Sequence, residues 1–344
     1  MKINVNNLTF GLAFVSKSYD RDAIQPQYKC VYLHNENDVL TLRTTDLQST
    51  SEIKIACISE KPFDTLVDFA TLQDIGSKTK TAKEDIITMS LGTKLVVSSG
   101  LATLRLPVMD SNLFPGFSFV ENPDDDEIST DDFLASLSCG AFCHKDRIPL
   151  TGVHFGNVIE ATNGFYGKRI ETPSISFSGN IVIPDKAVKA LQSLSQLDVP
   201  VIKVQEASNS LTFYGDEWVI SVQLLQSNYP DTSLGYNNSA QNTLVLDKDE
   251  FQSVLQILSI VGDTLQIAID YDTISLSVVG DEGSERVMTV PDGQLPNKVS
   301  VDIKMLLQIV KDLNSSTVNM IIGTTSQPIL IEDNNTVYFC VQYG

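Results

Sequence analysis

The chain repeats one strand-and-turn pattern three times with a period of 117 residues. A β-strand pattern that runs into a polar turn occurs at Val39–Asp46, returns at His154–Asn163 and returns again at Thr273–Gly280. Repeats of solenoid proteins span about 20–50 residues, whereas a period of this length is the size of a whole domain. The repeat therefore predicts three copies of one domain in a row, as in a scaffold or a ring.

Two polar segments mark the joints between the copies. Glu121–Glu127 and Gly235–Asn242 contain turn-forming residues and show no hydrophobic periodicity. We expect domains at 1–124, 125–240 and 241–344. The acidic stretch Asp124–Glu127 lacks the glycine and the spaced terminal carboxylate of a calcium loop, so it is interpreted as a solvated linker.

Each third carries two helix candidates. Asp247 and Glu250 form a capping box, and Phe251, Val254 and Leu255 follow on one apolar face. The same reasoning predicts helices over 8–17, after Pro62, over 130–137, after Pro184, after Asp247 and over 303–311.

Alternating strands lie between these helices. Lys94–Val97 with Ala102–Leu106 and Leu211–Tyr214 with Trp218–Val222 are typical of β-hairpins. Each third is therefore expected to be an α+β unit with a helix pair on one face of antiparallel sheet.

The net charge is −19, and each third of the chain is more negative than the one before it. The three thirds carry net charges of −3, −7 and −9. Bulk charge of this sign repels nucleic acid. Any role on DNA would need a local basic surface or a topological way of holding the duplex.

No catalytic motif stands out, so the chain is predicted not to be an enzyme and to hold no cofactor. It has three histidines and no metalloprotease helix motif, nucleophile elbow, phosphate-binding loop or dinucleotide fingerprint. The best metal candidate is Cys139, Cys143 and His144, with both cysteines expected on one helix. Since no second cluster completes four ligands, buried thiols are the favoured interpretation and no metal is expected.

Five cysteines form no disulfide framework, and an odd number is typical of reduced thiols. The first residues turn polar at once, and the apolar runs are too short to span a bilayer. These features predict a cytoplasmic protein with no membrane partner.

Four short motifs, in order along nearly the whole chain, resemble the bacterial-type sliding clamp, the β subunit of DNA polymerase III. Leu42–Leu47 is similar to that family's Thr-Asp-Leu turn, and Leu113–Pro115 to its Asp-Phe-Pro. Val182–Lys186 is similar to its Val-Pro-Arg-Lys helix start, and Asn228–Asp231 to its Phe-Pro-Asp-Tyr. The resemblance implies the DNA-clamp fold, in which three tandem α+β domains place sheets outside and helices inside.

The resemblance also implies that two chains close head to tail into a ring around double-stranded DNA. Topology then holds the duplex, without sequence preference, and inward cations offset phosphate repulsion. The candidates on or just beyond the predicted helices are Lys17, Arg21, Lys145, Arg147, Lys186, Lys189, Lys304 and Lys311. The alternative interpretation of each is an ordinary solvated helix face.

The family's second site is a hydrophobic pocket between domains two and three. It binds short linear motifs of the polymerase, the clamp loader and repair proteins. Carried over to this chain, the pocket residues are Leu150, Thr162, Gly164, Phe165, Tyr166, Pro230, Leu234, Phe339, Val341 and Tyr343.

The pocket motifs of this chain depart from the family. The usual Thr-Asp-Gly-His-Arg-Leu turn is Thr162–Gly167 here, and the usual Met-Pro-Met-Arg-Leu ending is Val341–Gly344. Rigid aromatic residues replace flexible methionine, so we expect the pocket to prefer a different motif. The alternative for Phe165, Tyr166 and Tyr343 is core packing.

Closing the ring needs a contact between domain one of one chain and domain three of its partner. The candidates are Leu104, Leu106 and Ile260, and their alternative is the core of their own domain. The leading function is a non-enzymatic processivity clamp. A clamp-like scaffold of a phage or mobile element with altered partners, and a tandem-domain structural protein that does not bind DNA, stay open as alternatives.

Overall fold

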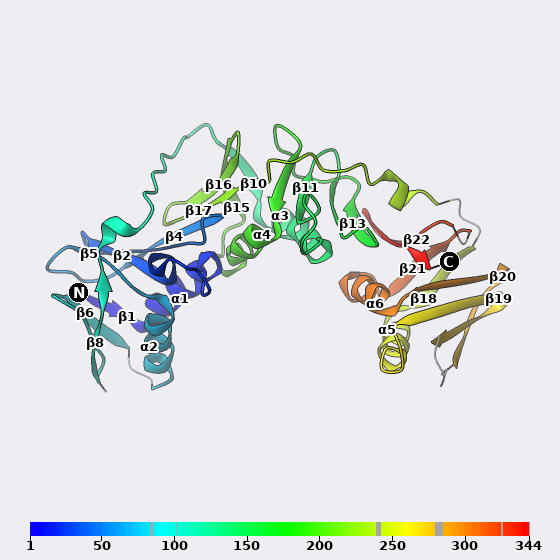
Figure 1. Ribbon diagram of the computed structural model, residues 1–344, viewed down its shortest axis with the longest axis horizontal. Coiled ribbons are helices and arrows are strands. Elements are labelled where there is room, and N and C mark those ends of the chain that lie inside the picture. The colour runs from blue at the N-terminus through cyan, green and yellow to red at the C-terminus, as the bar shows by residue number, and fades with distance from the viewer. Residues whose placement is uncertain (83–84, 101, 239–241, 279–284, 325, 344) are drawn as a thin grey trace. The chain divides into compact units, whose positions relative to one another are not determined.

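The computed structural model describes residues 1–82, 85–100, 102–238, 242–278, 285–324 and 326–343 (Figure 1). The chain forms two compact units. The first unit comprises Met1–Leu137 with Ile183–Gln226, and the second comprises Ser138–Val182 with Ser227–Gly344. The predicted division into domains at 124 and 240 stays a prediction. In each unit, one sheet contains strands from both sides of one of these predicted boundaries.

The first unit holds two antiparallel sheets. One has the strand order β1-β6-β7-β8 and the other the order β10-β15-β16-β17-β4-β3-β2-β5-β9. Their bounds are β1 (Lys2–Asn4), β2 (Cys30–Glu36), β3 (Val39–Thr45), β4 (Ser49–Ala56), β5 (Phe63–Asp68), β6 (Ile86–Leu91), β7 (Leu95–Ser98), β8 (Thr103–Leu106), β9 (Val108–Met109), β10 (Asp126–Ser129), β15 (Val201–Ala207), β16 (Ser210–Gly215) and β17 (Trp218–Gln223). The helices are α1 (Val5–Val15), α2 (Phe69–Thr81), α3 (Thr130–Leu137) and α4 (Asp185–Leu191).

The second unit repeats this plan. Its sheets have the orders β14-β11-β12-β13-β23-β22-β21-β18 and β19-β20-β24. The bounds are β11 (Gly152–Phe155), β12 (Ile159–Thr162), β13 (Tyr166–Ile170), β14 (Ile181–Pro184), β18 (Asn242–Asp247), β19 (Thr264–Val278), β20 (Glu285–Asp302), β21 (Thr317–Ile322), β22 (Ile329–Asp333), β23 (Thr336–Cys340) and β24 (Gln342–Tyr343). The helices are α5 (Lys248–Leu258) and α6 (Ile303–Asp312), with a 3₁₀ turn η4 (Ser138–Phe142) and another, η6 (Ser233–Tyr236).

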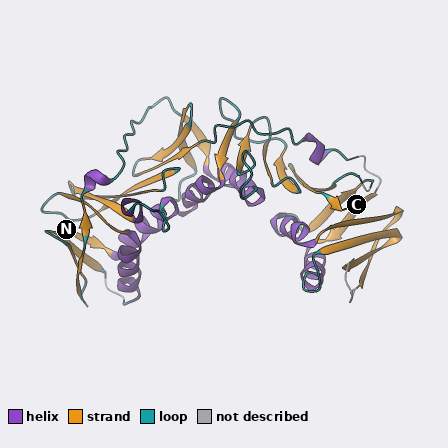
Figure 2. Cartoon of the chain, viewed as in Figure 1, coloured by secondary structure: helices purple, strands orange, loops and turns teal. Residues whose placement is uncertain are grey.

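Helices cover one face of the strands in each unit (Figure 2). In the second unit, α5 and α6 lie side by side, and Phe251, Leu255, Leu306 and Val310 are fully buried. These residues recur at the helical spacing that the sequence shows, because the apolar stripe of each helix must face the sheet. Their burial is the main source of stability in this layer.

The turns after β3 and β12 have the same hydrogen bonds, which confirms the first two copies of the repeat. The threonine that ends each strand, Thr45 or Thr162, donates its hydroxyl to a carbonyl four residues on, at 2.9 and 2.7 Å. The next residue, Asp46 or Asn163, accepts two backbone amides at its side-chain oxygen. The third turn residue, Gly280, lies outside the described residues.

The position after Asp46 and Asn163 is left-handed in both turns. Leu47 has φ 69° and Gly164 has φ 93°. A glycine adopts this region without the Cβ clash that a leucine meets. The side-chain hydrogen bonds of the turn hold Leu47 there, with 59% of its surface exposed.

Five of the six predicted helix positions are confirmed, with small shifts of their ends. The helix predicted after Pro62 is wrong: Phe63–Asp68 is the strand β5, which pairs with β2, and α2 follows from Phe69. Asp68 caps α2 by accepting the amide of Thr71 at 2.8 Å. Pro184 ends β14 and caps α4, rather than standing in its first turn.

The cysteines expected on one helix are separated. Cys139 lies in η4, fully buried, whereas Cys143 follows that turn. Burial raises the pKa of the Cys139 thiol to about 12, which keeps it protonated. Among the described residues, no three His, Cys, Asp or Glu side chains are grouped to hold a metal ion. No helix in the same residues is long and apolar enough to span a membrane.

Candidate functional site

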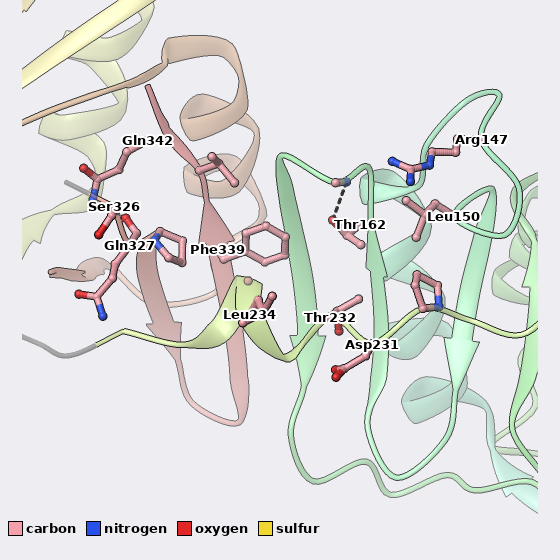
Figure 3. A pocket seen from close by; sticks show the side chains of 15 residues that line it. Arg147, Leu150, Thr162, Asp231, Thr232, Leu234, Ser326, Gln327, Phe339 and Gln342 are labelled. Carbon is pink, nitrogen blue, oxygen red and sulfur yellow. Dashed lines mark hydrogen bonds between the residues drawn. The ribbon is translucent and has the colours of Figure 1, made fainter. Parts of the chain in front are cut away.

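The second unit contains a pocket with a cavity volume of about 470 Å³ (Figure 3). Three segments far apart in the sequence meet there: the segment before β11 with the turn after β12, the linker 230–235, and the C-terminal region. The lining residues are Arg147, Leu150, Thr162, Gly164, Pro230, Asp231, Thr232, Leu234, Gly235, Ser326, Gln327, Pro328, Phe339, Val341 and Gln342.

Backbone pairing places the first and third walls next to each other. Strand β13 pairs antiparallel with β23, so that Gly167 lies opposite Phe339. Just beyond the strand end, the amide of Val341 donates to the carbonyl of Phe165 at 2.8 Å. The turn that carries Gly164 and the strand that carries Phe339 are therefore fixed by one continuous ladder.

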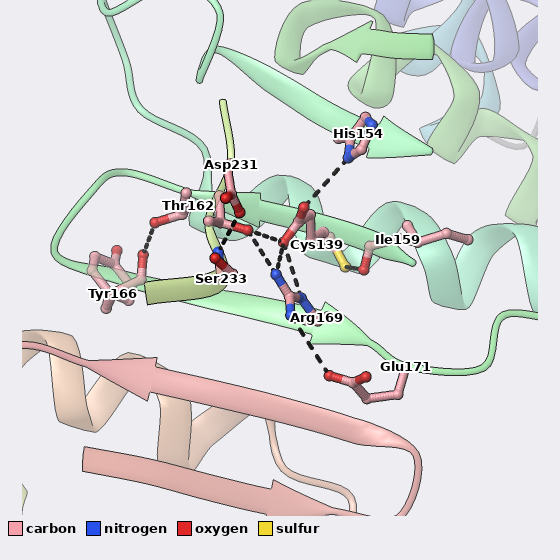
Figure 4. Close-up of polar contacts among 11 residues, drawn as sticks. Cys139, His154, Ile159, Thr162, Tyr166, Arg169, Glu171, Asp231 and Ser233 are labelled. Carbon is pink, nitrogen blue, oxygen red and sulfur yellow. Dashed lines mark hydrogen bonds and ion pairs between the residues drawn. The ribbon is translucent and has the colours of Figure 1, made fainter. Parts of the chain in front are cut away.

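A charged network, in which Glu160 is buried and Arg169 and Thr232 are half-buried, holds the linker that forms the second wall. Arg169 Nη2 donates to Glu160 Oε2 at 2.9 Å and to Thr232 Oγ1 at 2.7 Å. The Thr232 hydroxyl in turn donates to Glu160 at 2.6 Å. The Arg169 guanidinium lies 3.7 Å from the ring centroid of Tyr236, a cation–π contact. Figure 4 shows the hydrogen bonds and ion pairs of Arg169, including its ion pair with Glu171.

The first unit carries the same cross-strand ion pair with its charges exchanged. Arg43 on β3 lies opposite Glu52 on β4, as Glu160 on β12 lies opposite Arg169 on β13. Glu160 follows Arg43, and Arg169 follows Glu52, by 117 residues, which is the period of the sequence repeat. Arg43 lies 5.2 Å from the ring of Phe117 in the segment that leaves the first domain. One charged pair therefore fastens a linker in each unit.

Glu160 titrates below its ordinary range. Burial opposes its ionisation, but the His154 imidazole 3.4 Å away, the hydrogen bond from Thr232 and the charge of Arg169 outweigh burial, so its pKa is lowered from about 4.5. A group with a depressed folded pKa stabilises the protein above its unfolded pKa and loses that contribution as pH falls through the folded value.

Glu160→Gln should therefore flatten the acid dependence of stability. We expect the variant to be less stable than the wild type at about pH 7, with the difference shrinking below about pH 4.5. Denaturant midpoints measured across this range test the expectation. Glu171→Gln is the control, because Glu171 is 45% exposed and 4.0 Å from Arg169. A gap that stays constant down to about pH 3 would contradict the assignment.

The C-terminal wall is held by side-chain amides. Gln342 Nε2 donates to the carbonyls of Thr324 and Gln327, at 3.1 and 2.6 Å. Gln327 Oε1 accepts the amide of Thr324 at 3.1 Å. These bonds tie β24 to the loop before β22 and place the Ser326–Pro328 segment on the pocket rim.

Seven of the ten residues predicted for the pocket line it. The other three lie elsewhere. Phe165 is 53% exposed on its turn, Tyr343 is 41% exposed on β24, and the Tyr166 ring packs against Phe142 at 5.5 Å. The core-packing alternative therefore describes Tyr166, whereas Phe165 and Tyr343 are surface side chains.

Sequence reasoning missed part of the lining. Asp231, Gly235 and Gln342 adjoin predicted positions, and Thr232 lies two residues from both Pro230 and Leu234, so neighbouring residues could have been included. Ser326–Pro328 carries no motif in the sequence, and only the fold brings it to the rim. Arg147, which was predicted to face DNA from just beyond a helix, lines the pocket.

The other predicted cations are exposed. Lys17, Arg21, Lys186 and Lys189 belong to the first unit, and Lys145, Lys304 and Lys311 to the second. Two have nearby carboxylates: Lys189 lies 3.3 Å from Asp185, and Lys304 lies 2.7 Å from Asp263. Because the second helix was predicted to begin after Pro62, the prediction left out two further helix cations, Lys78 and Lys80, which lie in the last turn of α2.

The predicted interface residues differ in exposure. Leu104 is 43% exposed on β8, which ends the order of its sheet, whereas Leu106 is 8% exposed and packs within the first unit. Ile260 is 83% exposed just after α5, beside Ile257 at 64% and Val261 at 47%. Leu104 and the Ile257–Val261 patch are thus apolar surfaces, and Leu106 is not.

Sequence comparison finds curated relatives named β sliding clamp. The chain is 21% identical to the β sliding clamp of Staphylococcus aureus (strain Mu50 / ATCC 700699) over 257 residues, which cover 69% of this chain and 68% of that protein. It is 21% identical to the β sliding clamp of Buchnera aphidicola subsp. Rhopalosiphum padi over 357 residues, covering 97% and 96%. No protein-family model matches the chain.

Solved structures match along the whole chain. The β subunit of DNA polymerase III from Thermotoga maritima has a TM-score of 0.90 at 16% identity, covering 100% of this chain and 98% of that one. The sliding clamp of Bartonella birtlesii, solved bound to griselimycin, has a TM-score of 0.90 at 20% identity, covering 100% and 99%. The α+β clamp fold expected from the sequence is confirmed.

Proposed function

We propose that this chain, which is a bacterial-type sliding clamp, is a processivity factor for a DNA polymerase. The observation that carries the proposal is the match in fold to solved polymerase β subunits over all of the chain. The proposal assigns no chemical step to the protein. It acts by encircling duplex DNA and by holding its partners there.

The pocket of the second unit is the proposed partner site. Its walls combine apolar side chains, such as Leu150, Pro230 and Leu234, with the exposed charges of Arg147 and Asp231 at the rim. Short linear motifs bind grooves of this kind through a few apolar anchors and flanking polar contacts. We assign it to the polymerase and to the clamp loader.

The ring is proposed to be a head-to-tail homodimer. Each interface would join Leu104 on the free edge of β8 to the Ile257–Val261 patch of a second chain. An unpaired edge strand and an exposed apolar patch are both liabilities that an interface removes. Three domains in each of two chains would then close a ring of six.

Topological retention on DNA tests the proposal. The two chains of the proposed ring are allowed to associate in the presence of nicked circular plasmid. Co-elution of the protein with the plasmid is then measured at low and high salt, before and after the plasmid is cut. Co-elution that survives salt and is lost on linearisation is expected, because a closed ring slides off a free end. Co-elution that disappears in salt regardless of plasmid form would reduce the binding to ordinary charge attraction and would overturn the proposal.

The DNA-facing cations make a separate prediction. Lys186→Gln and Lys311→Gln should each make the salt dependence of binding to a short duplex shallower, by about 0.9 in the log–log slope for each phosphate that the variant no longer neutralises. Fluorescence anisotropy across a salt series measures the slope. Lys94→Gln, on the exposed turn between β6 and β7, is the control. An equal change in the control would refute the assignment of Lys186 and Lys311.

A clamp of a phage or mobile element with altered partners remains the second candidate. The observation that favours it is the pocket floor, where the aromatic Phe339 packs against two glycines. A polymerase and loader with a correspondingly altered motif would be its partners.

A further inference from the structure

A second cavity lies in the first unit and shares no lining residue with the partner pocket. Its volume is about 630 Å³. It is formed by α1, by the linker with β10, by the segment from the 3₁₀ turn η5 (Gln192–Gln196) to β15, and by the turn between β16 and β17. Two apolar side chains on its wall are partly exposed, Phe10 by 40% and Val201 by 48%. The cavity therefore offers apolar surface to a ligand.

The charges of this cavity are almost all of one sign, so we name it the acidic groove. Among the described residues that line it, Lys203 is the one cation, whereas the carboxylates are Glu121, Glu127, Asp198, Asp216 and Glu217. Each of these carboxylates is exposed, and none forms an ion pair with a described residue. Carboxylates gathered without counter-charges repel one another, and a cationic ligand relieves that repulsion.

Hydrogen bonds hold the linker against the sheet, so the groove is formed before any ligand binds. The Tyr214 hydroxyl lies 2.9 Å from the carbonyl of Asn122 and 2.9 Å from Asp125 Oδ2. Gln205 Nε2 donates to the same Asp125 oxygen at 3.1 Å. A site that is already ordered loses less conformational entropy on binding than a mobile one.

Trp218 offers the groove a hydrogen-bond donor that the protein does not use. Its side chain lines the groove, only 6% of its surface is exposed, and its ring meets Phe14 edge-on with the centroids 6.2 Å apart. The indole N–H has no hydrogen-bond partner among the described residues. The nearest neighbour of the indole nitrogen is Gly215, where a Cβ would lie 2.6 Å from Nε1. Since a buried tryptophan N–H normally has an acceptor, we expect a ligand to supply one.

The charges and the free donor together restrict the class of ligand. Among the described residues, no three acidic side chains are grouped to hold a metal ion. A polyamine carries cations but has no acceptor for the indole N–H. A nucleic acid has acceptors in its phosphates, but the carboxylates of the groove repel them. A basic peptide supplies both, because its main-chain carbonyls accept hydrogen bonds and its side chains carry the cations.

We propose that the acidic groove binds an arginine- or lysine-rich segment of a partner protein, with a peptide carbonyl accepting the indole N–H of Trp218. The cations of the segment pair with the carboxylates of the groove, and their methylene stems cover Phe10 and Val201. This site goes beyond the proposed processivity function, because it lies in the first unit and uses no residue of the partner pocket.

Trp218 is the single tryptophan of the chain, so its fluorescence reports binding at the groove itself. The probe is a synthetic peptide of about ten residues with alternating arginine and serine. A peptide with glutamate in place of arginine is the charge control. We expect the arginine peptide to give a saturable change in the emission of the full-length chain and the glutamate peptide to give none. Spermine should bind more weakly than the arginine peptide, and a short DNA duplex should leave the emission unchanged.

Paired charge variants separate the groove from the net charge of the protein. Glu217→Gln combined with Asp198→Asn removes two carboxylates of the groove. Asp74→Asn combined with Glu332→Gln is the matched control, because these two carboxylates are also exposed but do not line the groove. Fluorescence anisotropy of the labelled arginine peptide measures affinity, and melting curves confirm folding. We expect the groove variant to bind about fivefold more weakly than the wild type, and the control to match the wild type.

Trp218→Phe tests the hydrogen bond separately from the charges. The phenylalanine keeps an aromatic ring beside Phe14 but has no N–H. We expect the folded variant to bind the arginine peptide about threefold to tenfold more weakly than the wild type. Unchanged affinity in the folded variant would overturn the proposed contact. If this variant fails to fold, the emission of the wild type and the charge variants still decide.

Three further results would overturn the proposal. They are equal weakening in the groove variant and its control, peptide binding that leaves the emission of Trp218 unchanged, and binding of spermine as tight as that of the arginine peptide. Each would reduce the binding to attraction by net charge. None of these results bears on the partner pocket, which shares no residue with the groove, so the inference can fail while the proposed function stands.

Discussion

Replacing Ile260 with glutamate should convert the proposed homodimer into single chains of 37.7 kDa. The side chain is 83% exposed in the single chain, beside Ile257 and Val261. In the proposed ring it would be covered by β8 of the second chain, and a carboxylate buried there without a partner costs several kcal/mol. Light scattering at micromolar concentration measures the mass. The wild type should weigh about twice the single chain.

Controls for this prediction come from the same chain. Ile24→Glu changes a side chain that is 99% exposed and outside the proposed contact, so its mass should equal that of the wild type. Leu104→Glu should give single chains like Ile260→Glu. Leu106→Glu is unsuitable, because Leu106 is 8% exposed and a charge there would damage the fold of the first unit.

Mixing the two variants tests the head-to-tail geometry. A chain with Leu104→Glu keeps a sound Ile260 surface, and a chain with Ile260→Glu keeps a sound β8 edge. One of the two interfaces in the mixed pair is then intact, so dimer mass should partly return. In a self-complementary interface, each patch would meet its own copy, and mixing would not recreate one wild-type contact. Unchanged dimer mass in Ile260→Glu alone would already refute the assignment.

The sequence predicts those parts of the fold that depend on local pattern. The turns at Asp46 and Asn163 are formed by side-chain hydrogen bonds within five residues, so their repetition can be recognised from the amino-acid sequence alone. The helix α5 follows from the Asp247 cap and an apolar stripe. Both features are short-range, and the structure reproduces them.

Errors occur where tertiary pairing decides between helix and strand. Phe63–Asp68 contains apolar residues at spacings that fit either a helix or a strand, and its pairing with β2 makes it a strand. Recognising Asp68 as a cap with Thr71 would have moved the helix start to the correct place. Lys78 and Lys80 would then have joined the predicted cations.

The pocket was predictable through family resemblance but not from local physics. Leu150, Pro230 and Phe339 are brought together by the ladder between β13 and β23 and by the network around Arg169, which link distant segments. The Ser326–Pro328 rim depends on the amide contacts of Gln342. No periodicity or spacing in the sequence encodes such contacts.

Asp312→Ala should destabilise the second unit by about 3 kcal/mol, because it leaves a buried cation without its partner. Lys168 Nζ lies 2.7 Å from Asp312 Oδ2, and the Lys168 side chain is only 7% exposed. Ser138 Oγ lies 2.7 Å from the same ammonium, and Tyr338 OH donates to Asp312 at 2.9 Å. These contacts join β13, η4, α6 and β23. Denaturant unfolding of the full chain measures the loss.

The sign of the effect depends on which groups are removed. Asp312→Leu combined with Lys168→Met should recover most of the lost stability, because a buried ion pair replaced by apolar residues avoids desolvation of either charge. Asp263→Ala breaks an equally short contact, 2.7 Å to Lys304, in which both side chains are about two-thirds exposed, so it should change stability little. If Asp312→Ala and Asp263→Ala behaved alike, the burial of Lys168 would not carry the energy assigned to it. If the double variant were no better than Asp312→Ala, packing around α6 rather than the unpaired charge would explain the loss.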